Sequence, residues 1–318
     1  MQVDMILTNG NIITMNPKAQ AIAILKGKII AVGTSNQIKK LAGKTTKIID
    51  LKGKTVIPGL IDSHLHMRDF GASLTYLNLH GTTSIKEIQK KLQERVKRTP
   101  EKKWILGDGW DQEKLKEKRY PTRFDLDKVT PENPVFLYRT CRNMCIVNTK
   151  ALQIAGITKK TKPPRGGKID TDPKTGEPTG ILHTTSMNLI EKVIPEPKEE
   201  LEQRCLLACQ KAAEAGLTTV HWIIESPKEI QIIQNLRAKE KLPIRVYVMI
   251  PVEFMNHLIE LGLQTGFGDD IIKIGSIKIL TDGSLGARTA ALTEPYSDEP
   301  KTKGMTLHTQ EELNKLVI

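Results

Sequence analysis

The sequence has 318 residues, of which 39% are hydrophobic and 26% are charged, and its 48 basic and 36 acidic side chains give a formal charge of +12. This balance is typical of a globular protein with a sizeable core and excludes a disordered chain. The positive charge is scattered in short lysine pairs without a basic, aromatic-interleaved patch, so we expect no nucleic-acid partner. No apolar stretch approaches the roughly 20 residues that span a bilayer, and no secretory signal is present. We therefore expect a cytoplasmic protein with no membrane partner.

Residues 1–57 predict a small β-sandwich unit. Short apolar runs flank tight turns such as Asn9-Gly10, a pattern that favours hairpins. The paired runs are 5–8 with 11–15, 21–25 with 28–32, and 48–51 with 54–57. A unit of so few residues can bury only a small hydrophobic core by itself. We therefore expect it to pack beside a larger domain that begins near residue 58.

The first candidate site follows a β-branched run at residues 56–61, which predicts a short buried strand. His64 and His66 come at its end. Side chains two apart on a strand share a face, so both imidazoles can reach one metal ion, with Asp62 as a candidate acceptor that fixes a histidine tautomer. The alternative is one satisfied core histidine and one solvent-facing histidine, but the flanking residues favour a metal site.

Residues 68–200 predict an inserted subdomain rather than regular βα units. Ser84 caps a helix predicted at 84–98, strand-like runs occur at 104–107 and 135–138, and 166–180 has the composition of a loop. Trp110 and Asp111 follow a glycine-rich turn and could line a substrate pocket. A packing role for Trp110 remains the alternative.

From residue 201 onward, helices and apolar strands alternate, which indicates a parallel α/β sheet, either doubly wound or closed into a barrel. The predicted order is helix 201–215, strand 217–224, helix 227–241, strand 244–250, helix 252–263 and strand 271–280. Ligand residues at the carboxyl ends of strands favour the barrel.

Two residues of these strands are further candidates with open alternatives. His221 either lines the site or is a satisfied structural histidine. Lys278 lies in the strand at 271–280. Burial of its charge would be costly unless it is paired or modified, and the pattern alone slightly favours an outward-pointing lysine.

Several sequence blocks together resemble the amidohydrolase superfamily, in the amidohydrolase-3 branch that contains N-substituted formamide deformylases. The blocks are Asn9–Met15, Val56–His66, Gly109–Asp111, Pro121–Asp127, Asn148–Leu152, Thr175–Gly180, Gly216–His221 and Asp282–Leu292. The resemblance implies a TIM-type (β/α) barrel, a small β-sandwich and a large insertion after the first strand.

The resemblance also implies a divalent metal site, with zinc as the expected metal and one or two ions. His64 and His66 would be ligands from the first strand, and Lys278 would be the fourth-strand lysine that is carboxylated to bridge two metals. Carboxylation makes an anionic ligand of the ammonium group, which reverses the preference for an outward lysine. The implied reaction is hydrolysis of a small-molecule amide or formamide-type C–N bond by metal-activated water. Asp282 and Arg288, with Trp110, Asp111 and His221, are the implied pocket residues.

The sequence departs from the family pattern in three places. Asn143 stands where a histidine is usual, and His183 stands where an acidic residue is common. Members of the family continue past this length, and their general-base aspartate would lie beyond residue 318. His308 precedes a helix capped by Thr309 and Glu312 and is expected to be a loop residue. We therefore expect the first four barrel strands, at 58–318 with the insertion at about 68–200.

The second hypothesis is a catalytically inactive fragment or scaffold that lacks half of the metal site. An incomplete barrel has exposed strand edges, so we also expect association into homo-oligomers.

Overall fold

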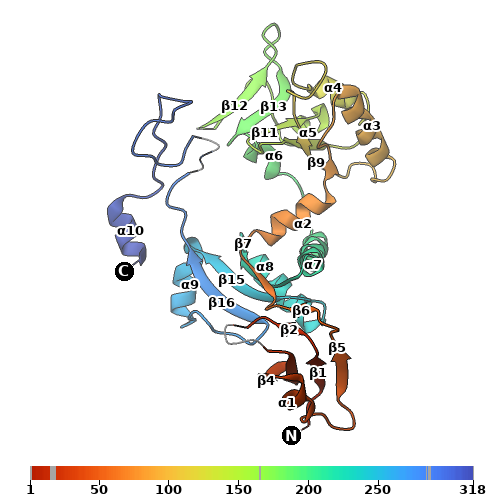
Figure 1. Cartoon of the computed structure of the whole chain (residues 1–318). Helices are drawn as coiled ribbons and strands as arrows, with labels where there is room; N and C mark the ends of the chain where they lie inside the picture. The colour runs from red at the N-terminus through yellow and green to blue at the C-terminus, as the bar shows by residue number, and fades with distance from the viewer. Residues whose placement is uncertain (1, 15–18, 165, 284, 286–287, 318) are drawn as a thin grey trace. The chain divides into compact units, whose positions relative to one another are not determined.

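The structure is a computed structural model that describes residues 2–14, 19–164, 166–283, 285 and 288–317 (Figure 1). It is a mixed α/β protein that divides into two compact units. The smaller unit comprises Met1–Asp62 with Ala215–Thr219, and the larger comprises Ser63–Glu214 with Val220–Ile318. Among the described residues, no helix is both long and apolar enough to cross a bilayer.

The smaller unit contains a four-stranded sheet in the order β4-β3-β1-β5. Its strands are β1 (Met5–Thr8), β3 (Ala21–Leu25), β4 (Lys28–Gly33) and β5 (Lys47–Asp50), with helix α1 (Ser35–Lys39). The hairpin of β3 and β4 is confirmed, because Leu25 pairs with Lys28 in an antiparallel register.

The other two predicted hairpins are wrong. Strand β1 already has a partner on each edge, β3 and β5, so no edge is left for the strand after Asn9-Gly10. That strand, β2 (Asn11–Ile12), pairs instead with β6 (Thr55–Val56) in parallel. The turn at Asn9, where φ is 55°, therefore carries the chain from one sheet to another.

Within the larger unit, the inserted segment forms a six-stranded mixed sheet in the order β12-β13-β11-β10-β9-β8. The strands are β8 (Leu77–Asn78), β9 (Ile105–Trp110), β10 (Val135–Arg139), β11 (Met144–Val147), β12 (Gly167–Thr171) and β13 (Pro178–Thr184). The prediction that residues 166–180 form a loop is thus partly wrong, since this stretch contains β12 and the start of β13. Its turn-forming residues are typical of a loop, so composition alone does not reveal the two short strands between them.

Both faces of the inserted sheet are covered by helices. Val135 and Leu137 pack into one buried cluster with α3 (Ile85–Val96) and α4 (Arg123–Asp127). Phe136, between them, packs into a second cluster with α5 (Thr149–Ile154) and α6 (Asn188–Glu191). The period-two alternation of strand side chains therefore divides one strand between two cores.

The remaining sheet has the order β16-β15-β14-β7, with β7 (Leu60–Leu65), β14 (Leu217–Ile223), β15 (Arg245–Pro251) and β16 (Ile272–Lys278). Helices α2 (Met67–Thr75), α7 (Lys198–Glu214), α8 (Pro227–Ala238) and α9 (Met255–Glu260) come between or after these strands, with a short 3-10 turn at Val252–Phe254. The alternation predicted for residues 201–280 is confirmed element by element.

The strand that carries the histidines differs from its prediction. It begins at Leu60 rather than Val56, and its residues are mostly exposed or half-buried, so the expectation of a short buried strand at 56–61 is wrong. The Pro58-Gly59 pair explains the late start, because proline cannot donate to a strand ladder.

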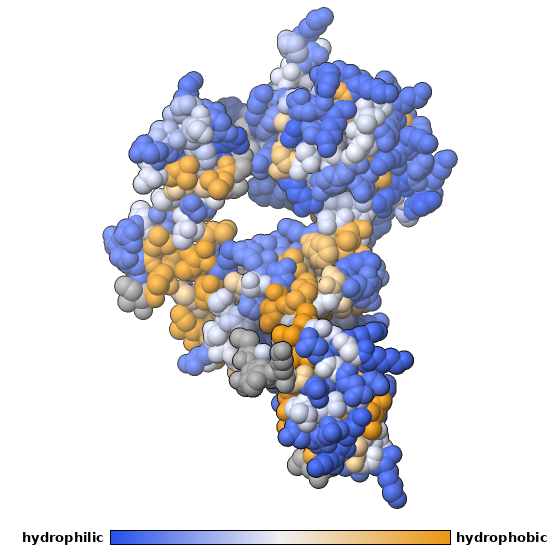
Figure 2. Space-filling view, viewed as in Figure 1, coloured by the Kyte–Doolittle hydropathy of each residue, from blue (hydrophilic) through white to orange (hydrophobic). Residues whose placement is uncertain are grey.

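The described residues of the last part of the chain, 281–283, 285 and 288–317, contain few regular elements. Helix α10 (Gln310–Val317) has the predicted cap, in which Thr309 and Glu312 exchange hydrogen bonds of 2.7 and 3.2 Å. His308 lies in a bend ahead of it. Figure 2 shows apolar side chains gathered on the surface near β16 and α9. The exposed apolar residues of α9, of β16 and of the segments that follow them include Ile259, Leu261, Phe267, Leu280 and Leu285.

Candidate metal centre

The two predicted histidines lie together where β7 meets α2. His64 is in the strand, and His66 is the residue before the first turn of the helix, with φ −89° and ψ 84°. Their ring centroids are 5.7 Å apart, and the rings are tilted by 50°. Two imidazoles that share a zinc ion at about 2.0–2.1 Å have centroids about 5–6 Å apart. The pair therefore fits a common ion.

Two carboxylates beside His66 extend the donor set, and the sequence reasoning missed both. Asp69 lies in the first turn of α2, and Glu225 lies two residues after β14. One ligand atom from each of His66, Asp69 and Glu225 lies within 4.8 Å of the others. The available signals were the His-x-x-Asp spacing, which places both side chains on one helix face, and an acidic residue just beyond a buried strand.

Glu225 is held in place from both sides. Arg68 donates to its Oε2 at 2.8 Å, and the other oxygen lies 3.6 Å from Nδ1 of His66. Burial raises the pKa of the Glu225 carboxyl, and the nearby charge of Asp69 raises it further. A carboxyl that is desolvated beside another carboxylate gains most from a nearby cation. This arrangement is suited to a divalent metal.

The loop that carries Glu225 is fixed by a buried acid, Glu229. Glu229 is fully buried and forms a capping box at the start of α8 with Ser226. It accepts hydrogen bonds from the indole nitrogen of Trp222 and from the backbone nitrogen of Glu225, both at 2.8 Å. These bonds fix the backbone of Glu225 and thereby limit the positions that its carboxylate can take.

Arg68 joins this end of the parallel sheet to the inserted segment. Besides Glu225, it donates three hydrogen bonds of 2.8–3.1 Å to the carboxylate of Glu196. Burial alone would lower the pKa of Arg68, but its bonds to Glu196 and the charge of Glu225 outweigh that effect and raise it. The guanidinium thus remains a permanent cation between two carboxylates.

Lys278 is the last residue of β16 and is half-buried. It lies beside Pro251, the last residue of β15, in a parallel register. Glu225, by comparison, follows the end of β14, and His64 is the penultimate residue of β7. Of the predicted ligands, His64 and Lys278 therefore lie at the carboxyl ends of strands in this sheet, and His66 follows the end of β7.

Trp110 and Asp111 belong to the inserted sheet. Trp110 is fully buried among apolar side chains, and its indole nitrogen donates to the Leu137 carbonyl at 2.9 Å. This is the packing role that the sequence left open for it. Asp111 accepts a bond from Arg139 at 2.9 Å.

The other predicted pocket residues lie in two different places. His221 packs on Tyr247 of the adjacent strand, with ring centroids 4.6 Å apart. Asp282 accepts from the backbone nitrogen of Ala291 at 3.0 Å, and Arg288 is ion-paired with Asp298. Asp282 and Arg288 thus stabilise the irregular segment after β16. His183, which stands where the family commonly has an acidic residue, lies 3.2 Å from Asp170 within the inserted sheet.

A cavity of about 520 Å³ adjoins the metal centre. Asp69 and Glu225 line it together with Arg68, Glu196 and Arg204. Its far wall includes Tyr138, whose hydroxyl donates to Glu191 at 2.7 Å. Burial, reinforced by this bond, raises the pKa of Tyr138, so the phenol stays protonated. The volume is within the roughly 300–1,000 Å³ of small-molecule sites.

The donor set lies near the ends of the strands and beside a cavity, and comparison with known proteins identifies the family. The sequence matches the Amidohydrolase family over residues 47–318, and the chain belongs to that family. It is 33% identical over 307 residues to the Bacillus subtilis protein named "Putative amidohydrolase YtcJ", covering 94% of this chain and 57% of that protein. It is 31% identical over 192 residues to the N-substituted formamide deformylase of Arthrobacter pascens, covering 59% of this chain and 35% of that enzyme.

A solved structure agrees over nearly the whole chain. An uncharacterized metal-dependent hydrolase from Pyrococcus horikoshii superposes with a TM-score of 0.81 at 33% identity, covering 98% of this chain and 62% of that one. The chain thus spans 57% of the length of the Bacillus subtilis relative and 62% of the length of the Pyrococcus horikoshii protein.

Proposed function

We propose that this chain forms part of a metal-dependent amidohydrolase that hydrolyses a non-peptide C–N bond, of the amide or formamide type, in a small molecule. The observation that carries the proposal is the pairing of His64 and His66, whose ring centroids lie 5.7 Å apart, together with the carboxylates of Asp69 and Glu225, which lie within 4.8 Å of a ring nitrogen of His66. This set offers nitrogen and oxygen donors, which suit zinc and other divalent ions.

The strand order supports a barrel as the framework of this site. In the sheet, β7, β14, β15 and β16 are neighbours in the same order as in the sequence. A doubly wound sheet reverses its strand order at a switch point, whereas a (β/α) barrel adds each new strand beside the last. Barrel enzymes place catalytic residues at the carboxyl ends of the strands, where these candidate ligands lie.

One group of residues in this chain would hold the metal, and another would hold the substrate. His64, His66 and Lys278 would bind one or two ions, with Lys278 as a carboxylated ligand, and Asp69 and Glu225 would contribute carboxylate oxygens. When bound, the metal supplies a Lewis acid and lowers the pKa of water toward about 7. Arg68 orients Glu225, and the adjoining cavity gives a small amide room to bind beside it.

The alternative is that the chain, spanning 57% of one relative, binds metal without turnover. Two measurements separate the hypotheses: zinc bound per chain, and hydrolysis of N-formyl and N-acyl amines with and without added zinc. Metal-dependent release of amine supports the hydrolase. Stoichiometric zinc without turnover supports the inactive scaffold, and the absence of zinc at His64 and His66 contradicts both.

A further inference from the structure

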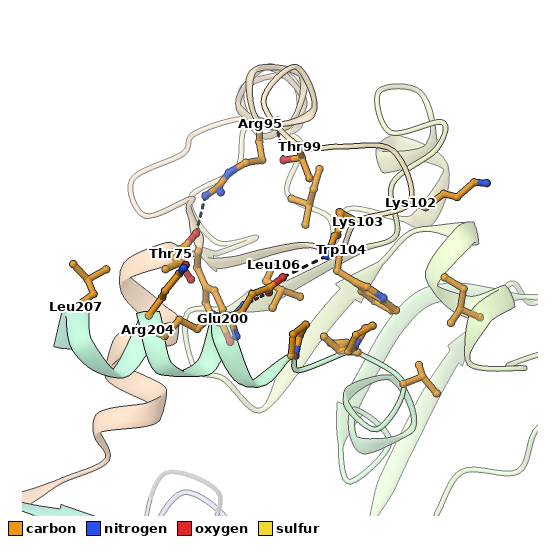
Figure 3. Close-up of a pocket in the computed structure, with 18 residues that line it drawn as sticks. Thr75, Arg95, Thr99, Lys102, Lys103, Trp104, Leu106, Glu200, Arg204 and Leu207 are labelled. Atoms are coloured by element: carbon orange, nitrogen blue, oxygen red, sulfur yellow. Dashed lines mark hydrogen bonds and ion pairs between the residues drawn. The ribbon is translucent and has the colours of Figure 1, made fainter. Parts of the chain in front are cut away.

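A second cavity lies between the inserted segment and α7. It has a volume of about 650 Å³, and it is bounded by the end of α2, the segment 99–106, the segment 193–197 and α7 (Figure 3). Its walls combine apolar side chains with polar and charged ones. They include Trp104, Leu106, Ile194, Pro197 and Leu207. The cavity can therefore hold a ring or an alkyl chain.

The charged groups of this cavity are predominantly basic. Arg95, Lys103 and Arg204 line it, whereas Glu200 is the acidic member. Lys102 also belongs to the lining, but its ammonium group points outward in Figure 3. Glu200 lies 3.4 Å from Lys103 and 3.8 Å from Arg204, so one carboxylate is shared between two cations. The excess of positive charge favours an anionic ligand.

Arg204 has the best position to recognise that anion. Its side chain is 21% exposed, and its 3.8 Å contact with Glu200 is longer than a hydrogen bond. Its backbone is fixed by close packing of α2 on α7, since a Cβ on Gly71 would lie 2.3 Å from the Arg204 carbonyl. A planar guanidinium with unused donors suits the two oxygens of a carboxylate.

The two cavities adjoin each other at Arg204. Tyr76, Leu106, Ile194, Pro195 and Arg204 line both of them. The cavity beside the metal centre is predominantly acidic, with Asp69, Glu191, Glu196 and Glu225, while the second cavity is predominantly basic. A ligand that spans both would have its anionic end in the second cavity and its reacting end near Glu225.

We propose that the second cavity binds the carboxylate end of an amphipathic small molecule, with Arg204 as the main contact and Lys103 and Arg95 as supporting charges. The assignment of a reacting end rests on the proposed hydrolase function, whereas the binding of the carboxylate does not. The substrate class is then an amide whose apolar body carries a carboxylate remote from the C–N bond.

Calorimetric titration with octanoate tests the binding site, with octylammonium and 1-octanol as probes of the same chain length. We expect octanoate to bind at least about tenfold more tightly than either. Arg204→Gln should weaken octanoate binding about tenfold or more, Arg204→Lys less, and Lys90→Gln, at an exposed position on α3 outside the cavity, not at all. Thermal unfolding followed by circular dichroism checks that each variant is folded. Equal binding of the three probes, or an unchanged affinity in folded Arg204→Gln, would overturn the proposal.

A second pair of measurements separates this site from the hydrolase function. The His64→Asn/His66→Asn variant should bind octanoate as the unmodified chain does, because the carboxylate site needs no metal. Among N-formyl amines, those with a remote carboxylate should have kcat/KM values about tenfold above their neutral analogues, and Arg204→Gln should abolish that preference. Octanoate binding without turnover would remove the hydrolase function alone, and turnover without any carboxylate preference or octanoate binding would remove this inference alone.

Discussion

The two sheets of the larger unit differ in what their side chains do. The inserted sheet is buried on both faces, and Trp110, Phe136 and Leu137 have no exposed surface. The parallel sheet leaves more of its surface open, with half-buried Lys278 at its edge and Leu280, just beyond β16, 59% exposed. The candidate metal ligands lie in this more open sheet or within a few residues of the ends of its strands. The comparison teaches that the inserted sheet is the more tightly packed of the two, while the groups proposed to bind a metal lie at the exposed strand ends of the other.

The largest effect is expected in the core of the inserted sheet. Trp110→Ala removes a fully buried indole and its hydrogen bond to Leu137, which should lower the free energy of unfolding by about 3–5 kcal/mol. Phe124→Ala, at a site 57% exposed, should cost about 1 kcal/mol or less. Urea unfolding followed by fluorescence measures both changes. Similar losses in the two variants would mean that the inserted sheet lacks the tight core that distinguishes it.

The contrast between the sheets also explains what the sequence could predict. The secondary structure of residues 201–280 could be predicted because apolar strands alternate with capped helices, and each element has its own local signal. The inserted sheet was harder, since β8, β11 and β12 are short and its strands pair in an order that no local pattern specifies. His64 and His66 were recognisable from their spacing alone. Asp69 had a usable signal in its His-x-x-Asp spacing. Glu225 had only the weak signal of an acidic residue just beyond a buried strand, because it meets His66 through strand pairing between segments about 160 residues apart, a separation that spacing rules do not span.

The next effect concerns the open edge of the parallel sheet. His64→Asn/His66→Asn should weaken zinc binding at least about 100-fold, or about 2.7 kcal/mol, because losing even an outer partner of a metal ligand costs roughly 10- to 100-fold. His257→Asn should have no effect, since that histidine is 71% exposed on α9. Equilibrium dialysis against zinc gives both affinities. Unchanged binding in the double variant would leave the parallel sheet without its proposed metal centre.

A smaller, pH-dependent effect is expected from an ion pair on the inserted side. Burial opposes the ionised form of Asp125, but bonds from Arg119 and Thr122 outweigh it and hold its pKa below the usual value. Because the folded pKa is depressed, the stability that this carboxylate contributes is present above about pH 3.9 and is lost as the pH falls through the folded pKa. Asp125→Asn should therefore cost about 1–2 kcal/mol at pH 7 and little in acid.

Unfolding curves recorded from pH 7 down to pH 2 measure this dependence. Glu94→Gln, at an exposed position on α3, should follow the unmodified protein across the whole range. A cost of Asp125→Asn that stays constant into acid would show that packing, rather than charge, holds α4 against the sheet.

The smallest predicted effect concerns Arg68, which links the two sides. Arg68→Gln removes the 2.8 Å contact with Glu225 and the bonds to Glu196, so Glu225 loses one of its two supports while its backbone remains fixed by Glu229. Zinc affinity should fall about tenfold, or about 1.4 kcal/mol, and Arg68→Lys should recover part of it because the charge is kept without the planar fork. Arg237→Gln, whose side chain is 47% exposed and lies 3.7 Å from Asp269, serves as the control for loss of a surface cation. If Arg68→Gln left the zinc affinity unchanged, the inserted segment would have no influence on the carboxylate of Glu225. The two sheets would then act independently.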